Sequence, residues 1–142
     1  MLDPRSRRTL IFVVSIAALA AFIWWRSRSV LRESLFRVEF DDSTISVIDP
    51  EGMKHSVPWS ALTKVAIRTT DAGPDEPDIF WGFHAGSAAP SVVFPQGATG
   101  DEQLLHALQS RLPEFRNDRL IEAMGSTSNA YFVVWESSQP AS

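Results

Sequence analysis

The sequence predicts an α+β fold in which an N-terminal transmembrane helix precedes an antiparallel β-sheet and C-terminal amphipathic helices. Three observations lead to this prediction. Residues 10–25 form an uncharged apolar run, residues 35–94 contain short segments of alternating apolar and polar residues, and residues 99–124 carry apolar residues at helical spacing. Alternation with a period of two indicates strands, whereas a period near 3.6 indicates amphipathic helices.

The apolar run at residues 10–25 predicts a single transmembrane helix. Its sixteen residues would form a helix of about 24 Å, slightly shorter than a hydrocarbon core of about 30 Å. We expect lipid contact through residues 9–25, with Trp24 and Trp25 at the membrane interface and Arg26 and Arg28 extending to the headgroups. Two alternatives remain: a buried core helix, and a signal peptide cleaved after Ala18-Leu19-Ala20.

The distribution of charge divides the chain. Seven arginines against two carboxylates give residues 1–37 a charge of +5, and six cations against fifteen carboxylates give residues 38–142 a charge of −9. An acidic domain is repelled by nucleic acid and by anionic lipid headgroups. We therefore expect no nucleic-acid partner and favour a basic protein partner, although acidity can also serve solubility alone.

The predicted organisation has four parts. Residues 1–28 form a tail and the transmembrane helix, 29–34 a connector, 35–136 the α+β domain and 137–142 a disordered tail. Counting of positive charges leans slightly toward a cytoplasmic domain, but the short basic N-terminus favours the opposite orientation. The side of the membrane on which the domain lies stays open.

The domain begins as a meander of short strands. Alternation predicts strands at residues 35–40, 44–48, 54–57, 64–69, 79–84 and 91–94, and a further strand at 131–135. Asp49-Pro50-Glu51-Gly52 has the composition of a type I turn. The absence of cysteine excludes disulfides and cysteine zinc sites.

Two amphipathic helices are predicted after the meander. Thr99 and Glu102 fit a capping box at the start of the first helix, whose leucines recur at helical spacing until Pro113 ends it. The second helix, residues 117–124, is expected to bury Leu120, Ile121 and Met124 and to end at Gly125 as a C′ glycine.

An acidic loop next to a tryptophan is the candidate partner-binding site. The loop carries Asp71, Asp75, Glu76 and Asp78, and Trp81 follows it closely. A calcium site and a plain solvated loop are the alternatives, but the spacing is not that of an EF-hand. Trp81 is either a binding hot spot or a core residue.

The strand at residues 79–84 has apolar residues at both odd and even positions, and these positions point to opposite faces of the sheet. Alternation sends Phe80 to one face of the sheet, and Trp81 and Phe83 to the other. The sheet is therefore expected to be apolar on both faces at this point. Such a sheet requires helices or a partner to cover it.

No pattern of catalytic or metal-ligating residues is found. His55, His84 and His106 do not lie three or four residues apart, and no serine has the spacing of a nucleophile elbow. We expect a protein that is not an enzyme and that binds no cofactor or metal.

The domain resembles the small pleckstrin-homology-like domains of bacterial membrane proteins. The resemblance covers residues 35–112 and is carried by Val57-Pro58-Trp59 with Leu62 and Val65, by Asp78-Ile79-Phe80-Trp81, and by the helix after Thr99. It implies a pleckstrin-homology-like antiparallel sheet or barrel in a single-pass protein of the bacterial inner membrane. The second helix and the strand at 131–135 depart from this pattern.

The expected function follows from the anchor, the acidic charge and the resemblance. Some small acidic proteins of this kind are immunity partners of bacterial toxins. We expect a membrane-tethered, non-catalytic protein-binding module, with an inhibitor or immunity protein as its most specific form. The alternative is an accessory scaffolding subunit of a membrane complex.

Overall fold

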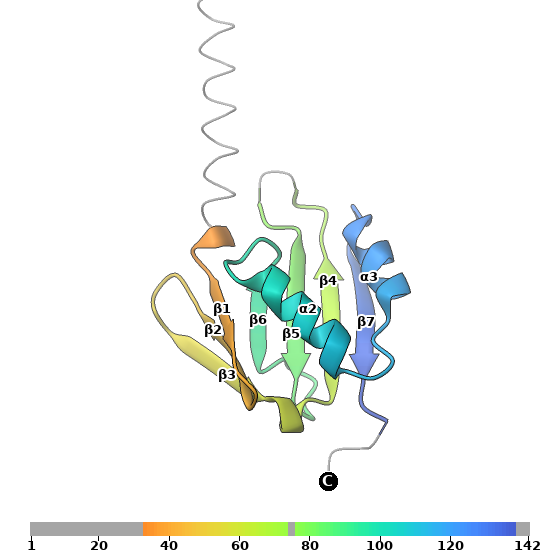
Figure 1. Ribbon diagram of the computed structural model, residues 1–142. Helices are drawn as coiled ribbons and strands as arrows, with labels where there is room; N and C mark the ends of the chain where they lie inside the picture. The colour runs from red at the N-terminus through yellow and green to blue at the C-terminus, as the bar shows by residue number, and fades with distance from the viewer. Residues whose placement is uncertain (1–32, 74–75, 139–142) are drawn as a thin grey trace, which may run out of the picture.

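The computed structural model describes residues 33–73 and 76–138. These residues form seven strands, a short 3₁₀ helix and two α-helices, shown in Figure 1. In chain order they are β1 (Arg37–Phe40), β2 (Thr44–Ile48), β3 (Lys54–Pro58), η1 (Trp59–Ala61), β4 (Lys64–Thr69), β5 (Ile79–His84), β6 (Val92–Pro95), α2 (Asp101–Arg111), α3 (Asn117–Met124) and β7 (Ala130–Glu136).

Strands β1, β2 and β3 form an antiparallel meander of three strands. Each turn is organised by an aspartate. The Asp41 carboxylate accepts the N–H groups of Ser43 and Thr44 at 2.8 Å, and these bonds lower the pKa of Asp41. At the second turn, the N–H of Gly52 donates to the Asp49 carbonyl at 2.9 Å, as expected for the predicted β-turn.

The second sheet has four antiparallel strands in the order β6-β5-β4-β7. Strands β4 to β6 are consecutive, whereas β7 follows both helices and returns to pair with the other edge of β4. A register shift between Val65 and Ala66 interrupts that pairing. Figure 1 shows α2 crossing in front of β5 and β4 of the four-stranded sheet, and α3 beside β7.

The core lies between the two sheets and the helices. One cluster of buried side chains joins Ile45 of β2, Phe83 of β5, Leu104 of α2 and Ala123 of α3. Phe94 stacks on Phe83, with ring centroids 5.7 Å apart. Because α2 and α3 contribute to the same cluster, both helices cover the same side of the four-stranded sheet.

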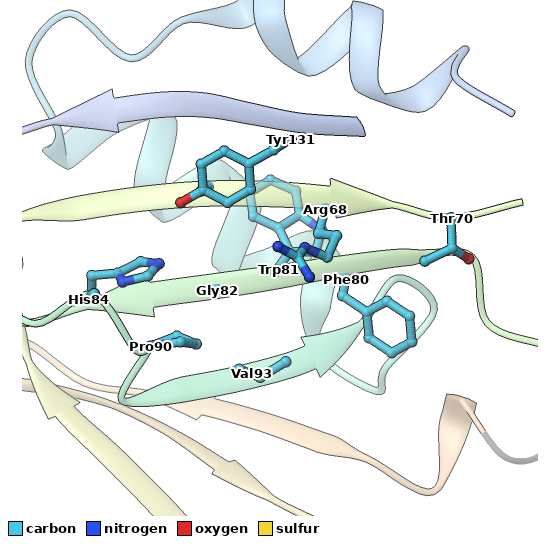
Figure 2. Close-up of a pocket in the computed structure, with 11 residues that line it drawn as sticks. Arg68, Thr70, Phe80, Trp81, Gly82, His84, Pro90, Val93 and Tyr131 are labelled. Carbon is cyan, nitrogen blue, oxygen red and sulfur yellow. The ribbon is translucent and has the colours of Figure 1, made fainter. Parts of the chain in front are cut away.

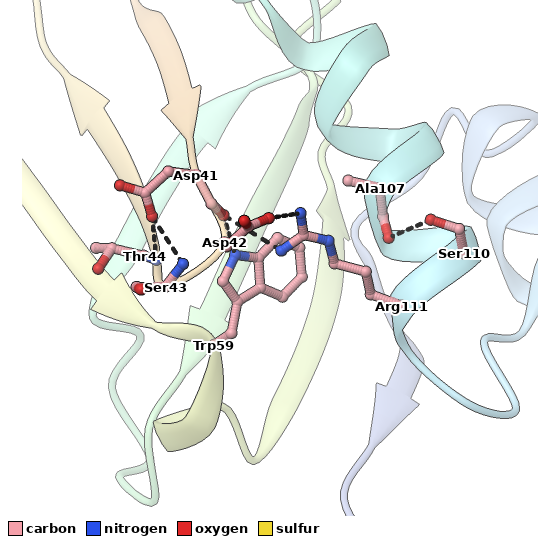
Figure 3. A network of polar contacts seen from close by, with 8 residues as sticks. All are labelled: Asp41, Asp42, Ser43, Thr44, Trp59, Ala107, Ser110 and Arg111. Carbon is pink, nitrogen blue, oxygen red and sulfur yellow. Dashed lines mark hydrogen bonds and ion pairs between the residues drawn. The ribbon is translucent and has the colours of Figure 1, made fainter.

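A polar network fixes the C-terminal end of α2 to the first sheet (Figure 3). The Arg111 guanidinium lies 4.8 Å from the centroid of the Trp59 ring and pairs with Asp42 at 3.0 Å. The Trp59 indole N–H donates to the Asp41 carbonyl at 2.9 Å, and Arg111 donates to the same carbonyl at 3.2 Å. The 3₁₀ helix after β3 therefore positions Trp59 as the link between β1, β2 and α2.

The α+β class and the antiparallel strands are confirmed, but the predicted start of the first helix is wrong. Its N-cap is Gly100, with φ +91°, and not Thr99. The Thr99 hydroxyl instead donates to the Ser34 carbonyl at 2.8 Å. A Cβ at Gly100 would collide with the Val38 carbonyl oxygen, so close packing against β1 decides this helix end.

The prediction for the second helix is also wrong in part. Leu120 is half-buried, but Ile121 is 72 % exposed and Met124 is 37 % exposed. Gly125 is the C-cap with φ −91°, so it does not adopt the left-handed conformation expected of a C′ glycine. Only one narrow side of α3 contacts the sheet, with Ala123 fully buried.

Among the described residues, no helix has the length and apolarity needed to cross a membrane. The predicted span at residues 9–25, with Trp24, Trp25, Arg26 and Arg28, lies outside the described residues. Asp75 and residues 139–142 lie outside them as well.

Candidate binding face on the four-stranded sheet

The four-stranded sheet has two unlike faces because successive side chains point to opposite sides. Val65, Ile67 and Phe83 point into the core. Ala66, Arg68 and other residues of the opposite parity form what we call the outer face. None of the elements in the described part of the chain packs on the outer face, since both helices lie on the core side.

The strand register arranges the outer face in rows. Tyr131 of β7 lies opposite Arg68 of β4, and Arg68 lies opposite Phe80 of β5. The next row has small residues at its centre, because Ala66 lies opposite Gly82. Large side chains therefore stand beside a floor made of a methyl group and a bare backbone.

This arrangement leaves a pocket of about 530 Å³ on the outer face (Figure 2). Its volume falls within the range typical of ligand sites, about 300–1,000 Å³. The row with Phe80 and Tyr131 forms one wall. Pro90, from the turn between β5 and β6, contributes to the opposite wall together with His84. The residues around the pocket are Ala66, Arg68, Thr70, Phe80, Trp81, Gly82, His84, Ala88, Pro90, Val93 and Tyr131.

His84 is a fixed part of the wall. The side chain is only 4 % exposed, and its Nδ1 lies 3.0 Å from the Ser87 carbonyl oxygen. Because a carbonyl can only accept, Nδ1 carries the proton and donates. Nε2 then faces the floor, 3.7 Å from the position that a Cβ on Gly82 would occupy.

The charges at the pocket are cationic. Arg68 is exposed, and its guanidinium makes no ion pair or hydrogen bond with any residue that the structure describes. The Lys64 ammonium lies 5.5 Å from the centroid of the Tyr131 ring. Glu136 is paired in register with Lys64 but does not line the pocket. No carboxylate belongs to the described residues that line it.

The acidic loop borders one end of this face. Thr70, which lines the pocket, donates its N–H to the Asp78 carbonyl at 2.8 Å and so closes the base of the loop. Asp71 and Glu76 are exposed, and Asp78 is half-buried. The backbone of Asp78 therefore lies near the pocket, while Asp75 lies outside the described residues.

Asp78 also belongs to a group of carboxylates behind the loop. Burial raises the pKa of Glu33, and the nearby charges of Asp78 and Asp101 raise it further. Asp101 accepts the N–H of Gly97 at 2.8 Å. This group is a local accumulation of negative charge at the end of the domain that carries the acidic loop.

Trp81 is not at the surface, so its prediction as a partner-binding residue is wrong. The residue is 3 % exposed, its indole N–H donates to the Gln96 side chain at 2.7 Å, and its ring stacks parallel to Phe94. Figure 2 shows the ring behind the sheet, on the opposite side from Arg68. The alternative interpretation, core packing, is confirmed.

The pocket contains residues that sequence reasoning missed. Alternation placed Phe80 on the face opposite Trp81, and this was the one signal of the outer face. Arg68 and Tyr131 are 63 residues apart in sequence, and only the pairing of β4 with β7 brings them together. Gly82 carries no chemical signal by itself, because its importance lies in the space it leaves.

The histidines are dispersed. His55 lies 3.5 Å from the Asp49 carboxylate at an exposed turn, His84 contacts the pocket, and His106 is exposed on α2. The described residues contain no group of three or more histidine, aspartate or glutamate side chains arranged to hold a metal ion.

The geometry of the pocket is suited to holding an apolar group beside a negative charge.

Comparison of this chain with protein families, with curated proteins and with solved structures finds no significant match in any of the three.

Proposed function

We propose that this protein is a non-catalytic protein-binding module that residues 9–25 tether to the bacterial inner membrane. The observation that carries the proposal is the outer face of the four-stranded sheet. Val93 is 45 % exposed and Tyr131 is 47 % exposed, and both border a pocket with apolar walls. Surfaces of this kind in soluble domains commonly mark interaction sites.

The net charge supports a basic partner. Residues 38–142 carry a charge of −9, and exposed Asp71 and Glu76 stand at the border of the outer face. Complementary charge accelerates the encounter of two proteins even when few of the charges end in direct contact. Inhibition of a basic protein, in the manner of an immunity protein, is the most specific form of this function.

The order of elements supports a pleckstrin-homology-like arrangement for residues 35–112. A meander of three strands packs on a second meander, and α2 follows β6 and packs into the shared core. The part after α2 departs from that plan, because β7 extends the second sheet beyond β4.

A second candidate function is an accessory scaffolding subunit of a membrane complex. Ile121 and Met124 form an exposed apolar surface on α3, which packs on the core side of the sheet. A protein with two separate apolar surfaces is able to contact two partners at once. This candidate therefore predicts contacts at α3 as well as at the outer face.

Photo-crosslinking in the native membrane tests both candidates. The photoreactive residue p-benzoylphenylalanine would replace Val93 on the outer face, Ile121 on α3, or Met53, which is 62 % exposed on the turn between β2 and β3. The proposed function predicts a crosslinked protein at position 93 and none at position 53. A crosslink at position 121 to a different protein supports scaffolding. Equal results at positions 93 and 53 would contradict both candidates.

A further inference from the structure

We propose that the pocket on the outer face recognises a carboxylate next to a bulky apolar group, presented by an extended segment of the partner protein. This inference rests on the proposed function and specifies the chemistry of its binding site. It concerns short-range contacts inside the pocket. The acidic loop acts at longer range on the partner's overall basic charge.

The first argument is the position of Arg68. Its guanidinium lies in the same cross-strand row as Phe80 and Tyr131, and it lines the pocket without a carboxylate partner among the described residues. A guanidinium presents a planar set of donors that matches the geometry of a carboxylate. A ligand with a carboxylate here would satisfy donors that the protein leaves to water.

The second argument is the apolar surface around Arg68. Phe80 and Pro90 contribute apolar walls, and the floor is Ala66 with the backbone of Gly82 (Figure 2). A free inorganic anion would leave these surfaces uncovered. An aromatic or branched aliphatic group attached to the carboxylate would bury them.

The third argument concerns the source of the ligand. Val93 and Tyr131 line the pocket from β6 and β7, the two edge strands of the sheet, and the Lys64 ammonium lies over the Tyr131 ring outside that lining. Adjacent strands lie about 4.8 Å apart, so a ligand that contacts both edge strands spans roughly 14 Å, and a small molecule with a single ring would cover only part of that width. An extended peptide segment would cover these residues in succession, with its acidic residue at Arg68.

The test uses two probes of the same shape, 3-phenylpropionate and 3-phenylpropanamide, titrated onto the full chain in lipid nanodiscs. Binding is followed by NMR through the amide signals of Ala66 and Gly82. Because exposed ion pairs contribute modestly, we expect the carboxylate to bind about two- to fivefold more tightly than the amide. Arg68→Gln should abolish this difference, whereas Lys54→Gln, at an exposed cation of β3, should preserve it.

The possible outcomes separate this inference from the proposed function. Equal affinity for the two probes, or signal changes only outside the pocket, would overturn the carboxylate preference. If position 93 still crosslinks to a protein in that case, the binding face stands and only its chemistry is wrong. If neither probe binds and position 93 gives no crosslink, both proposals fail. Finally, the crosslinked peptide should contain an aspartate, a glutamate or a C-terminal carboxylate beside an apolar residue, and a peptide without one would also refute the inference.

Discussion

Adding a side chain at the floor of the pocket should weaken ligand binding without destabilising the domain. Gly82 lies at the centre of β5, and a Cβ built there meets Pro90 Cβ at 3.5 Å and His84 Nε2 at 3.7 Å. Both distances are ordinary van der Waals contacts, and the residue does not have positive φ. A methyl group at this position therefore fits the fold but occupies part of the pocket.

The expected change in stability follows from backbone entropy. A glycine in the middle of a strand destabilises a protein by about 0.5–1 kcal/mol relative to alanine. Gly82→Ala should thus raise the free energy of unfolding by about 0.5–1 kcal/mol. Gly82→Val should be at least as stable as the wild type, because β-branched residues are favoured in strands.

Binding should change in the opposite direction. The γ-methyl groups of Gly82→Val would stand on the floor between the wall of Phe80 and that of Pro90, where the apolar group of a ligand has to lie. We expect the affinity for 3-phenylpropionate to fall by about tenfold or more, which corresponds to a loss of about 1.4 kcal/mol. Urea unfolding followed by near-ultraviolet circular dichroism measures stability, and the NMR titration measures binding.

Gly125→Ala is the matched control. It adds the same methyl group at the end of α3, where the nearest atoms are the Ile121 carbonyl oxygen at 3.7 Å and the Glu122 carbonyl oxygen at 3.8 Å. Binding should be unchanged in this variant. The reasoning is refuted if Gly82→Ala lowers the free energy of unfolding by more than about 1 kcal/mol, or if Gly82→Val binds the probe as well as the wild type does.

Two further predictions concern charge. Replacing Asp71 and Glu76 by lysine should slow association with the crosslinked partner several-fold and weaken the salt dependence of the association rate, because exposed charges are screened beyond about 8 Å at physiological ionic strength. The control is the same charge reversal at Glu51 and Glu114, both exposed, which should have a smaller effect. Association kinetics across a salt series measure both variants, and equal effects would contradict a role for the loop. The raised pKa of Glu33 means that folding favours its protonated form, so this group contributes stability below its ordinary pKa of 4.5, and that contribution is lost as the pH rises through the folded pKa. Glu33→Gln should flatten this decline in urea unfolding above pH 4.5, and an unchanged pH profile would show that burial of the group is not coupled to folding.

The sequence by itself determined the local elements of the domain. Period-two alternation located the strands from β1 to β6, and β7, because each strand has one face in the core. Helical spacing located α2, where Leu104 and Leu108 are buried as expected. These patterns are readable because burial acts on individual side chains at fixed intervals along the chain.

Helix ends and the exposed side of α3 were decided by tertiary contacts. Thr99 has the residue type of an N-cap, but the fold places its hydroxyl on the Ser34 carbonyl and begins the helix after Gly100. Ile121 and Met124 have the spacing of buried residues, yet Ile121 is 72 % exposed and Met124 is 37 % exposed. The spacing of apolar residues predicts which of them share one side of a helix, but not how many of them are buried against another element.

The candidate site was decided almost entirely by the tertiary structure. The acidic loop was recognisable from composition, and the outward direction of Phe80 followed from alternation. Trp81 was ambiguous because both faces of its strand are apolar, and the position of α2 on one side decided that it is a core residue. Arg68 and Tyr131 meet only because β7, which follows both helices in the chain, pairs with β4. A sequence specifies which side chains alternate within a strand, whereas long-range pairing selects the strand beside it, and the pocket depends on that choice.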